Sequence, residues 1–459
     1  MTNLRQQAIQ YAHANRGRFL DELKEYLKIP SISTDPAHQM DMQRAAEWTA
    51  NQLESLGFQQ VRVYPTGGHP VVYGEWLQSG AQVPTMLVYG HYDVQPPDPL
   101  ELWESGPFEP SVRGENLFAR GATDMKGQVM AALKALEAVK QGGALPLNVK
   151  VLVEGEEEIG SPNLAEFINS HRQMLNCDFA LNPDSGILAP DVPTITYALR
   201  GLAYFELRLT GPDHDLHSGM FGGAVHNPAQ ALCEIIAGMH DEQGRVTLPG
   251  FYDRVRPLDE EERAELSRLP VGDEFYLKET GAPALWGEAG YTTIERLGAR
   301  PTLEVCGLLS GYTGEGSKTV LPSKAMAKIS CRLVPDQDPD EVHSQLLEYL
   351  RQRVPPTVRW ELIKMAGAPA AISDRSSPWV KAISKALETV WGKRPVFRRE
   401  GGSVPVVTLF KELLGVESVN VGFSLPGDNL HSPNEKIHLP TWYNGIDALV
   451  HFYCNLGEG

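Results

Sequence analysis

The first part of the chain alternates between stretches with helical spacing of apolar residues and short continuous apolar runs. Helical spacing marks residues from about 3 to 28, 42 to 56 and 125 to 139. The segments VRVYP, VVYGEW and TMLVYG between them have the composition of strands, and the last is apolar enough for the centre of a sheet. VKVLVEG and CDFALNPDSG follow as further strands. Strands that alternate with helices predict a mainly parallel α/β sheet up to about residue 198.

The pattern changes to period-two alternation at YALRGLAYFELRLTG. AMAKISCRLVP and TVRWELIK are two more strand-like segments, and helical stretches run from about 227 to 240 and from 339 to 351. Two strand and helix units of this kind predict a small α+β layer. The stretch from about 248 to 302 is rich in charge and Pro, and its pattern assigns no element.

An α/β pattern resumes late in the chain, with a helix over 379 to 391, the segments VPVVTLF and VESVNVGF, and a last helix from about residue 442. The simplest arrangement is a discontinuous first domain with the middle segment inserted into it as a second domain. The predicted boundaries are 1–198 and 372–459 for the first domain and 199–371 for the second.

Composition excludes several classes of protein. The 459 residues are 42% hydrophobic, and 41 basic against 58 acidic residues give a formal charge of −17. Because there is no run of Lys and Arg, nucleic acid and an anionic membrane are not expected as main partners. Five cysteines without a CxxC pair indicate neither a disulfide framework nor a thiolate zinc site. The N-terminal residues lack a signal-peptide pattern and no stretch reaches the ~20 apolar residues of a membrane span, so we expect a cytoplasmic location.

Polar clusters close three of the apolar segments. TMLVYGHYD ends on His91 and Asp93, LFARGATDMKGQ carries Asp124, and LNVKVLVEGEEEIGS leads to Glu157 and Glu158. In open α/β sheets, ligands collect at the carboxyl ends of the strands. Three such ends with His, Asp and Glu predict one metal site.

None of these clusters is specific alone. Residues at i and i+2 share a face, so Asp93 is expected to accept the second imidazole proton of His91. Asp124 alone would suit a helix N-cap, and the adjacent glutamates alone would suit a solvated charge run. Asp184 in NPDSG and His431 in GDNLHSPNEK add two more donors. Several carboxylates close together would repel one another unless cations neutralised them, so divalent metals are the expected partners.

Eight ordered motifs carry a resemblance that covers nearly the whole chain: GHYDVQP, RGATDMKG, EGEEEIGS, DSG, DLHSG, SGYTGEGSKTVLP, REGGSVP and DNLHSPNEK. In order and spacing they resemble the M20 family of dinuclear zinc metallopeptidases, especially its cytosolic nonspecific dipeptidase or carnosinase branch. The resemblance implies a catalytic α/β domain with an inserted α+β lid and dimerisation domain. It also implies two divalent ions per subunit, with zinc expected and manganese or cobalt as alternatives.

The resemblance implies a role for each metal-site residue. Asp124 would bridge the two ions, with a cis peptide bond after it. His91 and Asp184 would complete one coordination shell, and Glu158 and His431 the other. Asp at position 184, where acylase and carboxypeptidase branches tend to carry Glu, favours the dipeptidase side.

The catalytic and substrate-binding residues follow from the same resemblance. Glu157 would be the general base toward a water held between the cations, with Asp93 as a supporting catalytic residue. His217 in DLHSG would supply the oxyanion donor, from the partner subunit of a homodimer formed through the inserted domain. Arg332 in SCRLVP would hold the substrate carboxylate. Thr319 in SKTVLP and Ser403 in REGGSVP would assist it.

The predicted activity is metal-dependent hydrolysis of dipeptides or short peptides with a free C-terminal carboxylate. Deacylation of N-acyl amino acids by the same residues is an alternative, and a non-catalytic, metal-stabilised binding protein is another. An intact Glu157 argues against the binding protein, because a pure binder needs no base. The segment KMAGAPAA departs from the carnosinase pattern, so no side-chain preference is inferred. His214, His226 and His438 are expected to be structural.

Overall fold

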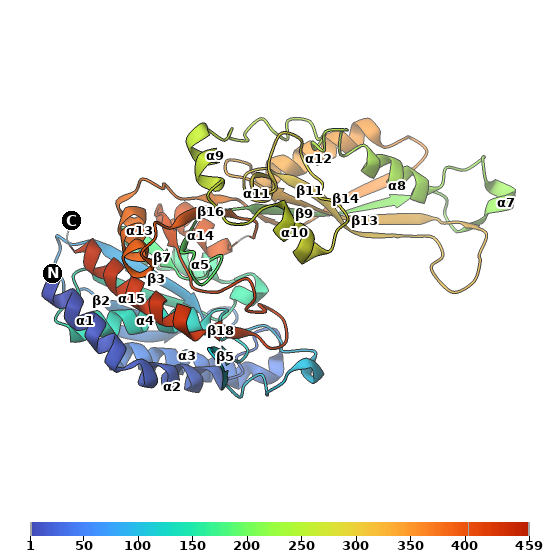
Figure 1. Cartoon of the computed structure of the whole chain (residues 1–459). Coiled ribbons are helices and arrows are strands. Elements are labelled where there is room, and N and C mark those ends of the chain that lie inside the picture. The colour runs from blue at the N-terminus through green and yellow to red at the C-terminus, as the bar shows by residue number, and fades with distance from the viewer. Residues whose placement is uncertain (1, 403, 458–459) are drawn as a thin grey trace. The chain divides into compact units, whose positions relative to one another are not determined.

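The computed structural model describes residues 2–402 and 404–457, which divide into two compact units. Unit 1 comprises Met1–Tyr197, Ser373–Phe397 and Pro405–Gly459, and unit 2 comprises Ala198–Ile372 and Arg398–Val404 (Figure 1). The short segment Arg398–Val404 therefore groups with the middle of the chain, whereas the sequence pattern assigned it to the resumed first domain. Its contacts explain this, since Arg399 donates to Glu262 at 2.9 Å and the backbone of Glu400 accepts from Arg200 at 3.2 Å.

Unit 1 is built on a mixed sheet with a parallel centre. The strands of this sheet are β1 (Gln59–Tyr64), β2 (Val71–Trp76), β3 (Thr85–His91), β6 (Asn148–Glu154), β7 (Phe179–Asn182), β8 (Thr194–Leu199), β15 (Ala371–Ile372), β16 (Val396–Glu400) and β17 (Ser418–Asn420). Of these, β15 lies in the residue range of unit 2, and β8 and β16 each cross from one range into the other. The order is β1-β2-β6-β3-β7-β17-β8-β15, with β16 beside β8. The ladder β6-β3-β7-β17 is parallel, and antiparallel pairs flank it on both sides. The predicted α/β class with a mainly parallel sheet is confirmed. The structure adds that the outer strands on both sides of the sheet pair antiparallel.

Helices cover this sheet and bury their apolar stripes against it. They are α1 (Thr2–Ala14), α2 (Arg16–Leu27), α3 (Gln39–Ser55), α4 (Lys126–Gln141), α5 (Leu164–Ser170), α6 (Arg172–Leu175), α13 (Pro378–Trp391), α14 (Pro405–Leu409) with a π-turn at Phe410–Leu414, and α15 (Leu439–Leu456). Helix α4 is buried from Lys126 to Val139, and α15 lies beside it (Figure 1). The two helices meet closely at Gly127, whose carbonyl accepts a hydrogen bond from Trp442 at 2.8 Å. A Cβ at Gly127 would lie 2.0 Å from the Ala122 carbonyl oxygen, so glycine is required there.

The predicted N-terminal helix is in fact two helices, α1 and α2, that meet at Asn15. Asn15 leaves helical geometry, with φ −109° and ψ 10°. Its side-chain amide donates to the Tyr11 carbonyl oxygen at 2.8 Å. Asparagine offers the backbone such an alternative to the helical ladder, which apolar spacing alone does not reveal.

A small three-stranded sheet ties the end of the chain to the loop before α4. It contains β4 (Ser111–Arg113), β5 (Asn116–Phe118) and β18 (Lys436–His438), in the order β18-β5-β4. Short 3-10 turns complete the unit at Pro36–His38, Leu100–Leu102 and Glu157–Ile159. The antiparallel β18/β5 pair places the residues before β18 next to those after β5.

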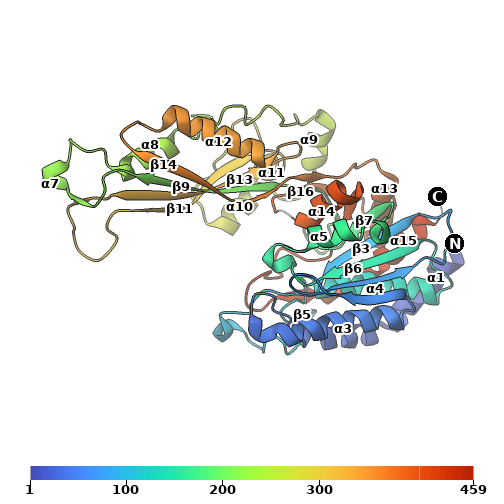
Figure 2. The same ribbon diagram turned by 180° about the vertical axis from the view of Figure 1, so that it is seen from behind.

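Unit 2 is an antiparallel sheet with helices on one face. Its strands are β9 (Gly201–Thr210), β11 (Thr302–Ser310), β13 (Lys324–Leu333) and β14 (Arg359–Ala368), in the order β11-β13-β9-β14. Helices α8 (Pro228–Ala237) and α12 (Pro339–Arg353) lie over one face (Figure 2) and close a core that includes Phe205 and Leu346. A separate two-stranded ladder pairs β10 (Leu216–His217) with β12 (Val320–Leu321), just before α7 (Ser218–Phe221).

The stretch without a sequence assignment folds around a buried ion pair. It carries α9 (Glu260–Leu266), α10 (Asp273–Thr280) and α11 (Thr293–Gly298). Arg300 donates two hydrogen bonds of 2.7 Å to Glu288, and its guanidinium lies 5.1 Å from the ring of Tyr252 and 4.3 Å from that of Tyr291. Leu248 and Phe251 join the core of unit 2, but the buried apolar residues of this segment are too widely scattered to form a stripe, so hydrophobic periodicity could not predict its elements.

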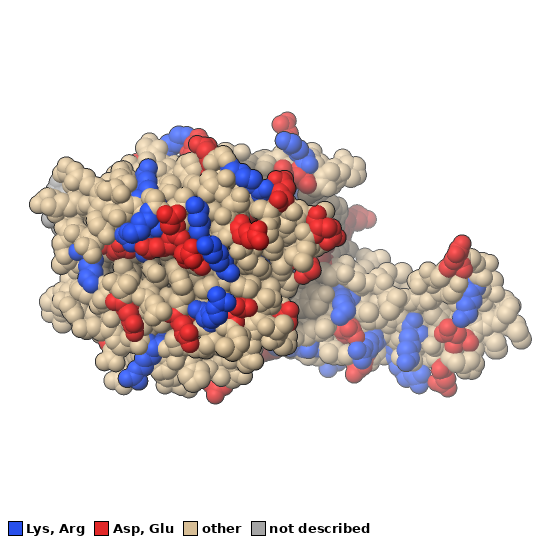
Figure 3. All heavy atoms as spheres, turned by 90° about the horizontal axis from the view of Figure 1, so that it is seen from below, with Lys and Arg blue, Asp and Glu red and all other residues tan. Residues whose placement is uncertain are grey.

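The surface carries charges of both signs. Figure 3 shows Lys and Arg interspersed among Asp and Glu on the face that it displays. The formal charge of −17 is therefore not gathered into one acidic field on that face. Within the described ranges, no helix has both the length and the apolar content needed to span a bilayer.

Candidate metal centre

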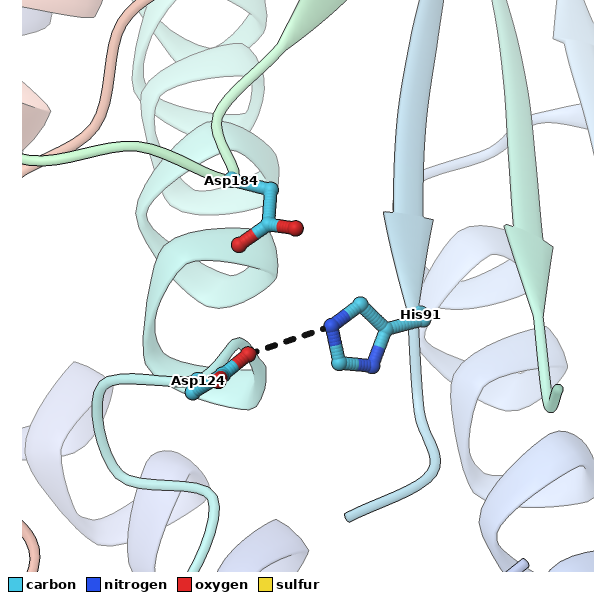
Figure 4. A group of neighbouring side chains, drawn as sticks. All are labelled: His91, Asp124 and Asp184. Atoms are coloured by element: carbon cyan, nitrogen blue, oxygen red, sulfur yellow. Dashed lines mark ion pairs between the residues drawn. The ribbon is translucent and has the colours of Figure 1, made fainter. Parts of the chain in front are cut away.

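One group of potential metal ligands gathers at the carboxyl ends of the parallel strands. His91 ends β3, Asp184 follows β7, and Asp124 lies in the loop before α4. One donor atom from each lies within 4.8 Å of the others. Figure 4 shows the three side chains pointing toward one another, with His91 Nε2 3.3 Å from Asp124 Oδ1. The topology produces this convergence, because β3 and β7 are adjacent and parallel.

A second group shares Asp124 with the first. Asp124, Glu158 and His431 also offer donor atoms within 4.8 Å of one another. His431 Nε2 is 3.0 Å from Asp124 Oδ2 and 3.3 Å from Glu158 Oε2. Since Oδ1 of Asp124 faces His91 and Oδ2 faces His431, its carboxylate is placed to bridge two cations. The peptide bond between Asp124 and Met125 is cis, as expected from the resemblance.

The electrostatics of the cluster fit a cation. Burial, and then the charge of Asp124, raise the pKa of Asp184 well above its usual range. Burial also raises the pKa of Glu157 to about 7, with the charge of Glu158 acting in the same direction. These carboxylates therefore ionise at a cost that nearby positive charge would remove.

The imidazoles point to the same conclusion. The carboxylates of Asp124 and Glu158 raise the pKa of His431 to about 10. His91 is fully buried, yet its Nε2 makes no hydrogen bond of normal geometry to any described residue, although Asp124 Oδ1 is near. A buried ring nitrogen without a hydrogen bond and with carboxylate oxygens around it has the donor arrangement of a metal ligand.

Asp93 acts on more groups than the sequence suggested. His91 Nδ1 donates to the backbone carbonyl oxygen of Asp93 at 3.0 Å, and the Asp93 carboxylate is the more distant acceptor, with Oδ1 at 3.4 Å. That carboxylate accepts the backbone N–H groups of Glu157 at 3.3 Å and Glu158 at 3.1 Å. The sequence predicted one hydrogen bond, from His91 to the Asp93 carboxylate. In the structure Asp93 instead contacts two parts of the site. Asp93 orients the His91 ring through its backbone and the Glu157–Glu158 turn through its side chain.

The two adjacent glutamates have different surroundings. Glu158 Oε2 accepts a hydrogen bond from Gln95 at 2.9 Å and lies in the second ligand group. Glu157 begins the 3-10 turn after β6 and belongs to neither ligand group among the described residues. It is thus close to the cluster without being needed to hold a cation.

The other two glutamates of EGEEE have structural roles that the charge run itself does not indicate. Glu156 accepts the backbone N–H of His69 at 3.0 Å and the side-chain amide of Asn163 at 2.9 Å. Glu154 accepts from Tyr89 at 2.8 Å and from Ser161 at 2.9 Å, and burial raises its pKa to about 8. Only their hydrogen-bond partners distinguish these two glutamates from Glu157 and Glu158, and two of those partners, His69 and Tyr89, lie far away in sequence.

The remaining predicted site residues lie in unit 2 or outside the described residues. His217 is exposed at the end of β10, and its Nδ1 accepts the backbone N–H of Gly219 at 3.0 Å. Thr319 is beside it, because its carbonyl oxygen accepts from Ser218 N at 3.0 Å. Arg332 is on β13, opposite Leu202 of β9. Ser403 lies outside the described residues.

The three histidines that were expected to be structural lie outside both ligand groups. His226 pairs with Thr357 at 2.7 Å, and His438 pairs with Thr441 at 2.7 Å. His214 is exposed in the loop before β10. The metal-ligand groups found among the described residues include none of the three.

Removal of bound metal should destabilise the protein more strongly as pH rises. The raised pKa values of Glu157 (about 7), Asp184 and His431 (about 10) mean that the folded, metal-free chain binds protons more tightly than the unfolded chain. Their contribution to stability is present at low pH and is lost as pH rises toward these values. The hydrogen bond with His431 and the nearby charge of His91 overcome burial and lower the pKa of Asp124, so its opposite contribution changes only in more acidic solution, near or below an ordinary Asp pKa of about 3.9.

The measurement is the Tm of chelated and metal-replete protein across this range. The gap in stability should widen from about pH 5 to about pH 8, by an amount on the order of 1 kcal/mol in the free energy of unfolding, because solvent screens the ion pairs of the half-exposed His431. Ligand deprotonation, which strengthens metal binding, acts in the same direction. A gap that is constant with pH would show that the cluster is not neutralised by a cation.

Comparisons with known proteins give one consistent result. The model of peptidase family M20/M25/M40 matches residues 87–455. The chain is 31% identical to the Cys-Gly metallodipeptidase of Candida albicans, over 95% of this chain and 94% of that protein. It is 29% identical to the beta-Ala-His dipeptidase of Homo sapiens, over 99% of this chain and 93% of that protein. The crystal structure of an M20 family metallo-carboxypeptidase from Sulfolobus solfataricus superposes with a TM-score of 0.84 at 35% identity, covering 96% of this chain and 99% of that one.

Proposed function

Because the chain belongs to peptidase family M20/M25/M40, we propose that it hydrolyses dipeptides or short peptides with a free C-terminal carboxylate, using two divalent cations. One observation carries this proposal: the two ligand groups share Asp124, and the partly buried carboxyl of Glu157 lies beside them without belonging to either. The dipeptidase names of the two curated relatives support the substrate class.

The donor set favours zinc, with manganese or cobalt as alternatives. Each ligand group contains one imidazole and two carboxylates, and imidazole nitrogen with carboxylate oxygen suits zinc. His91 and Asp184 would hold one ion, Glu158 and His431 the other, and Asp124 both. When bound, the ions would lower the pKa of a shared water and polarise the scissile carbonyl.

Glu157 is the proposed general base. Burial raises its pKa to about 7 in the metal-free chain, and a base is most effective when its pKa is near the working pH. Asp93 accepts the backbone N–H of Glu157 and so holds it at the rim. Glu157 would take a proton from the attacking water and deliver it to the leaving amine.

Residues of unit 2 are proposed to bind the substrate. Arg332 would pair with the C-terminal carboxylate, assisted by Thr319 and Ser403, since a guanidinium suits planar bidentate recognition. His217 would donate to the oxyanion, and its contact with Gly219 fits this role. Because Nδ1 accepts that N–H, a neutral ring carries its proton on Nε2, where it can be donated.

We further propose that the protein is a homodimer, with His217 serving the partner's active site. The strand β11 supports this, because it ends the sheet of unit 2 and exposes Val305, Leu308 and Leu309. An uncovered apolar edge strand is a ready surface for pairing with another chain. A cytoplasmic location stays a prediction from the sequence.

Deacylation of N-acyl amino acids is the second candidate, because it needs the same base, cations and carboxylate anchor. A panel of dipeptides and N-acyl amino acids with matched C-terminal residues, assayed on protein of measured metal content, separates the two. We expect turnover of the dipeptides and little of the N-acyl compounds. Preference for the N-acyl compounds would reverse the assignment. Turnover of neither by metal-replete protein would favour a binding protein.

A further inference from the structure

The carboxylate of Glu435 is buried and accepts hydrogen bonds from one short segment. Glu435 has no exposed surface. Its Oε1 accepts the backbone N–H groups of Thr123 at 3.0 Å and Asp124 at 3.1 Å. Its Oε2 accepts Gly121 N–H at 2.9 Å and the guanidinium of Arg120 at 2.7 Å. Glu435 thus neutralises Arg120 and accepts hydrogen bonds from three backbone N–H groups of the segment that contains Asp124.

These donors converge because the segment is sharply turned. Gly121 has φ +81°, and a Cβ there would lie 2.7 Å from Val94 Cγ1, so the turn requires glycine. Successive N–H groups on such a turn form a concave anion site, which the Glu435 carboxylate fills. The backbone N–H of Asp124 is one of the donors, so Glu435 restrains the residue that belongs to both ligand groups.

Glu435 also belongs to the loop that presents His431. The ends of this loop are tied together, since Lys436 N donates to the Asp428 carbonyl oxygen at 3.0 Å and Lys436 Nζ to its carboxylate at 2.9 Å. His431 has φ +58°, a strained conformation for a residue with a side chain. Such a backbone is held only by its surroundings, and the Glu435 contacts are part of them.

We propose that Glu435 is a positioning residue that sets the spacing between Asp124 and His431, and with it the affinity for the cation they share. This inference rests on the two-cation site of the proposed function. If the proposal is correct, loss of Glu435 should affect the two ligand groups unequally. His91 is on β3 and Asp184 follows β7, so the first ligand group depends on Glu435 only through Asp124. The second depends on it through both Asp124 and His431.

The test is a metal titration of Glu435→Gln against a chelator, with zinc or cobalt, on protein stripped of metal. The carboxamide keeps the shape of the side chain but turns an NH₂ group toward two of the four donors. Loss of a residue that orients ligands typically weakens metal binding about 10–100-fold. We expect a loss of that size for one of the two ions and a much smaller change for the other.

Glu154→Gln is the matched control. Glu154 is an equally buried carboxylate of unit 1, with Tyr89 and Ser161 as partners rather than the loops of Asp124 and His431. We expect it to leave the ratio of the two affinities unchanged. If Glu435→Gln does not fold, Glu435→Asp, which keeps the charge but is one methylene shorter, is titrated on the same criterion.

Equal weakening of both ions, or no change in either, would overturn the proposal. So would an equally selective loss in Glu154→Gln. The readout is metal affinity and not peptide turnover, so it separates this inference from the proposed function. A parent protein that binds two ions but cleaves no peptide contradicts the function and leaves the role of Glu435 open to the same titration.

Discussion

Glu157→Gln is expected to retain its metal and to hydrolyse dipeptides about 10²–10⁴-fold more slowly than the parent protein. The carboxamide fills nearly the same volume but cannot accept a proton. Because Glu157 belongs to neither ligand group, its loss should leave metal affinity nearly unchanged. The loss should therefore fall on kcat, with KM changed little. Steady-state kinetics and metal analysis on the same sample measure both quantities.

Glu158→Gln is the matched variant at the adjacent position. It makes the same chemical change in a residue whose Oε2 lies 3.3 Å from His431 Nε2. We expect reduced metal affinity, with part of the activity recovered at high metal concentration. Nearly full activity in Glu157→Gln would remove Glu157 from the mechanism. Loss of metal from both variants to the same extent would mean that both glutamates are ligands.

Mixed dimers of Glu157→Gln and His217→Ala are expected to regain activity that neither variant has alone. Removal of an oxyanion donor typically lowers kcat about 10²–10³-fold, so His217→Ala should be nearly inactive. In a mixed dimer with His217 acting across the interface, one site combines the intact Glu157 of one chain with the intact His217 of the other. The second site lacks both. The mixture should therefore approach half the activity of the parent per heterodimer.

The experiment needs the variants to be dissociated, mixed and reassociated, with heterodimers counted by differently tagged chains. Each variant taken through the same steps alone is the control. Heterodimers that form and stay inactive would place His217 in its own chain's site, and full activity of His217→Ala alone would place His217 outside catalysis. An active monomer would contradict both the dimer and the transfer of His217.

Sequence alone predicted that the polar residues at the strand ends lie close together. The apolar runs before His91, Glu157 and Asp184 predict strands, and parallel neighbours necessarily bring their carboxyl ends to one edge. These candidate ligands can be named from the sequence because the spacing of apolar residues, which predicts each strand and its end, is a local property of the chain. The bridging role of Asp124 needed the family resemblance, since an Asp before a helix, taken alone, is more often a cap.

Only the tertiary structure decided which buried polar groups meet. In the local sequence, nothing distinguishes Glu156, which holds a loop through His69, from Glu157 beside the candidate metal ligands. Glu435 lies 311 positions from Asp124, yet its carboxylate accepts the Asp124 N–H. Arg300 and Glu288 likewise organise a segment that has no apolar stripe. Hydrophobic spacing predicts which side of an element is buried, because burial of apolar area is nearly independent of the partner. A buried hydrogen bond, by contrast, needs one particular partner at a short distance. Which residue becomes that partner is decided only when the chain has folded.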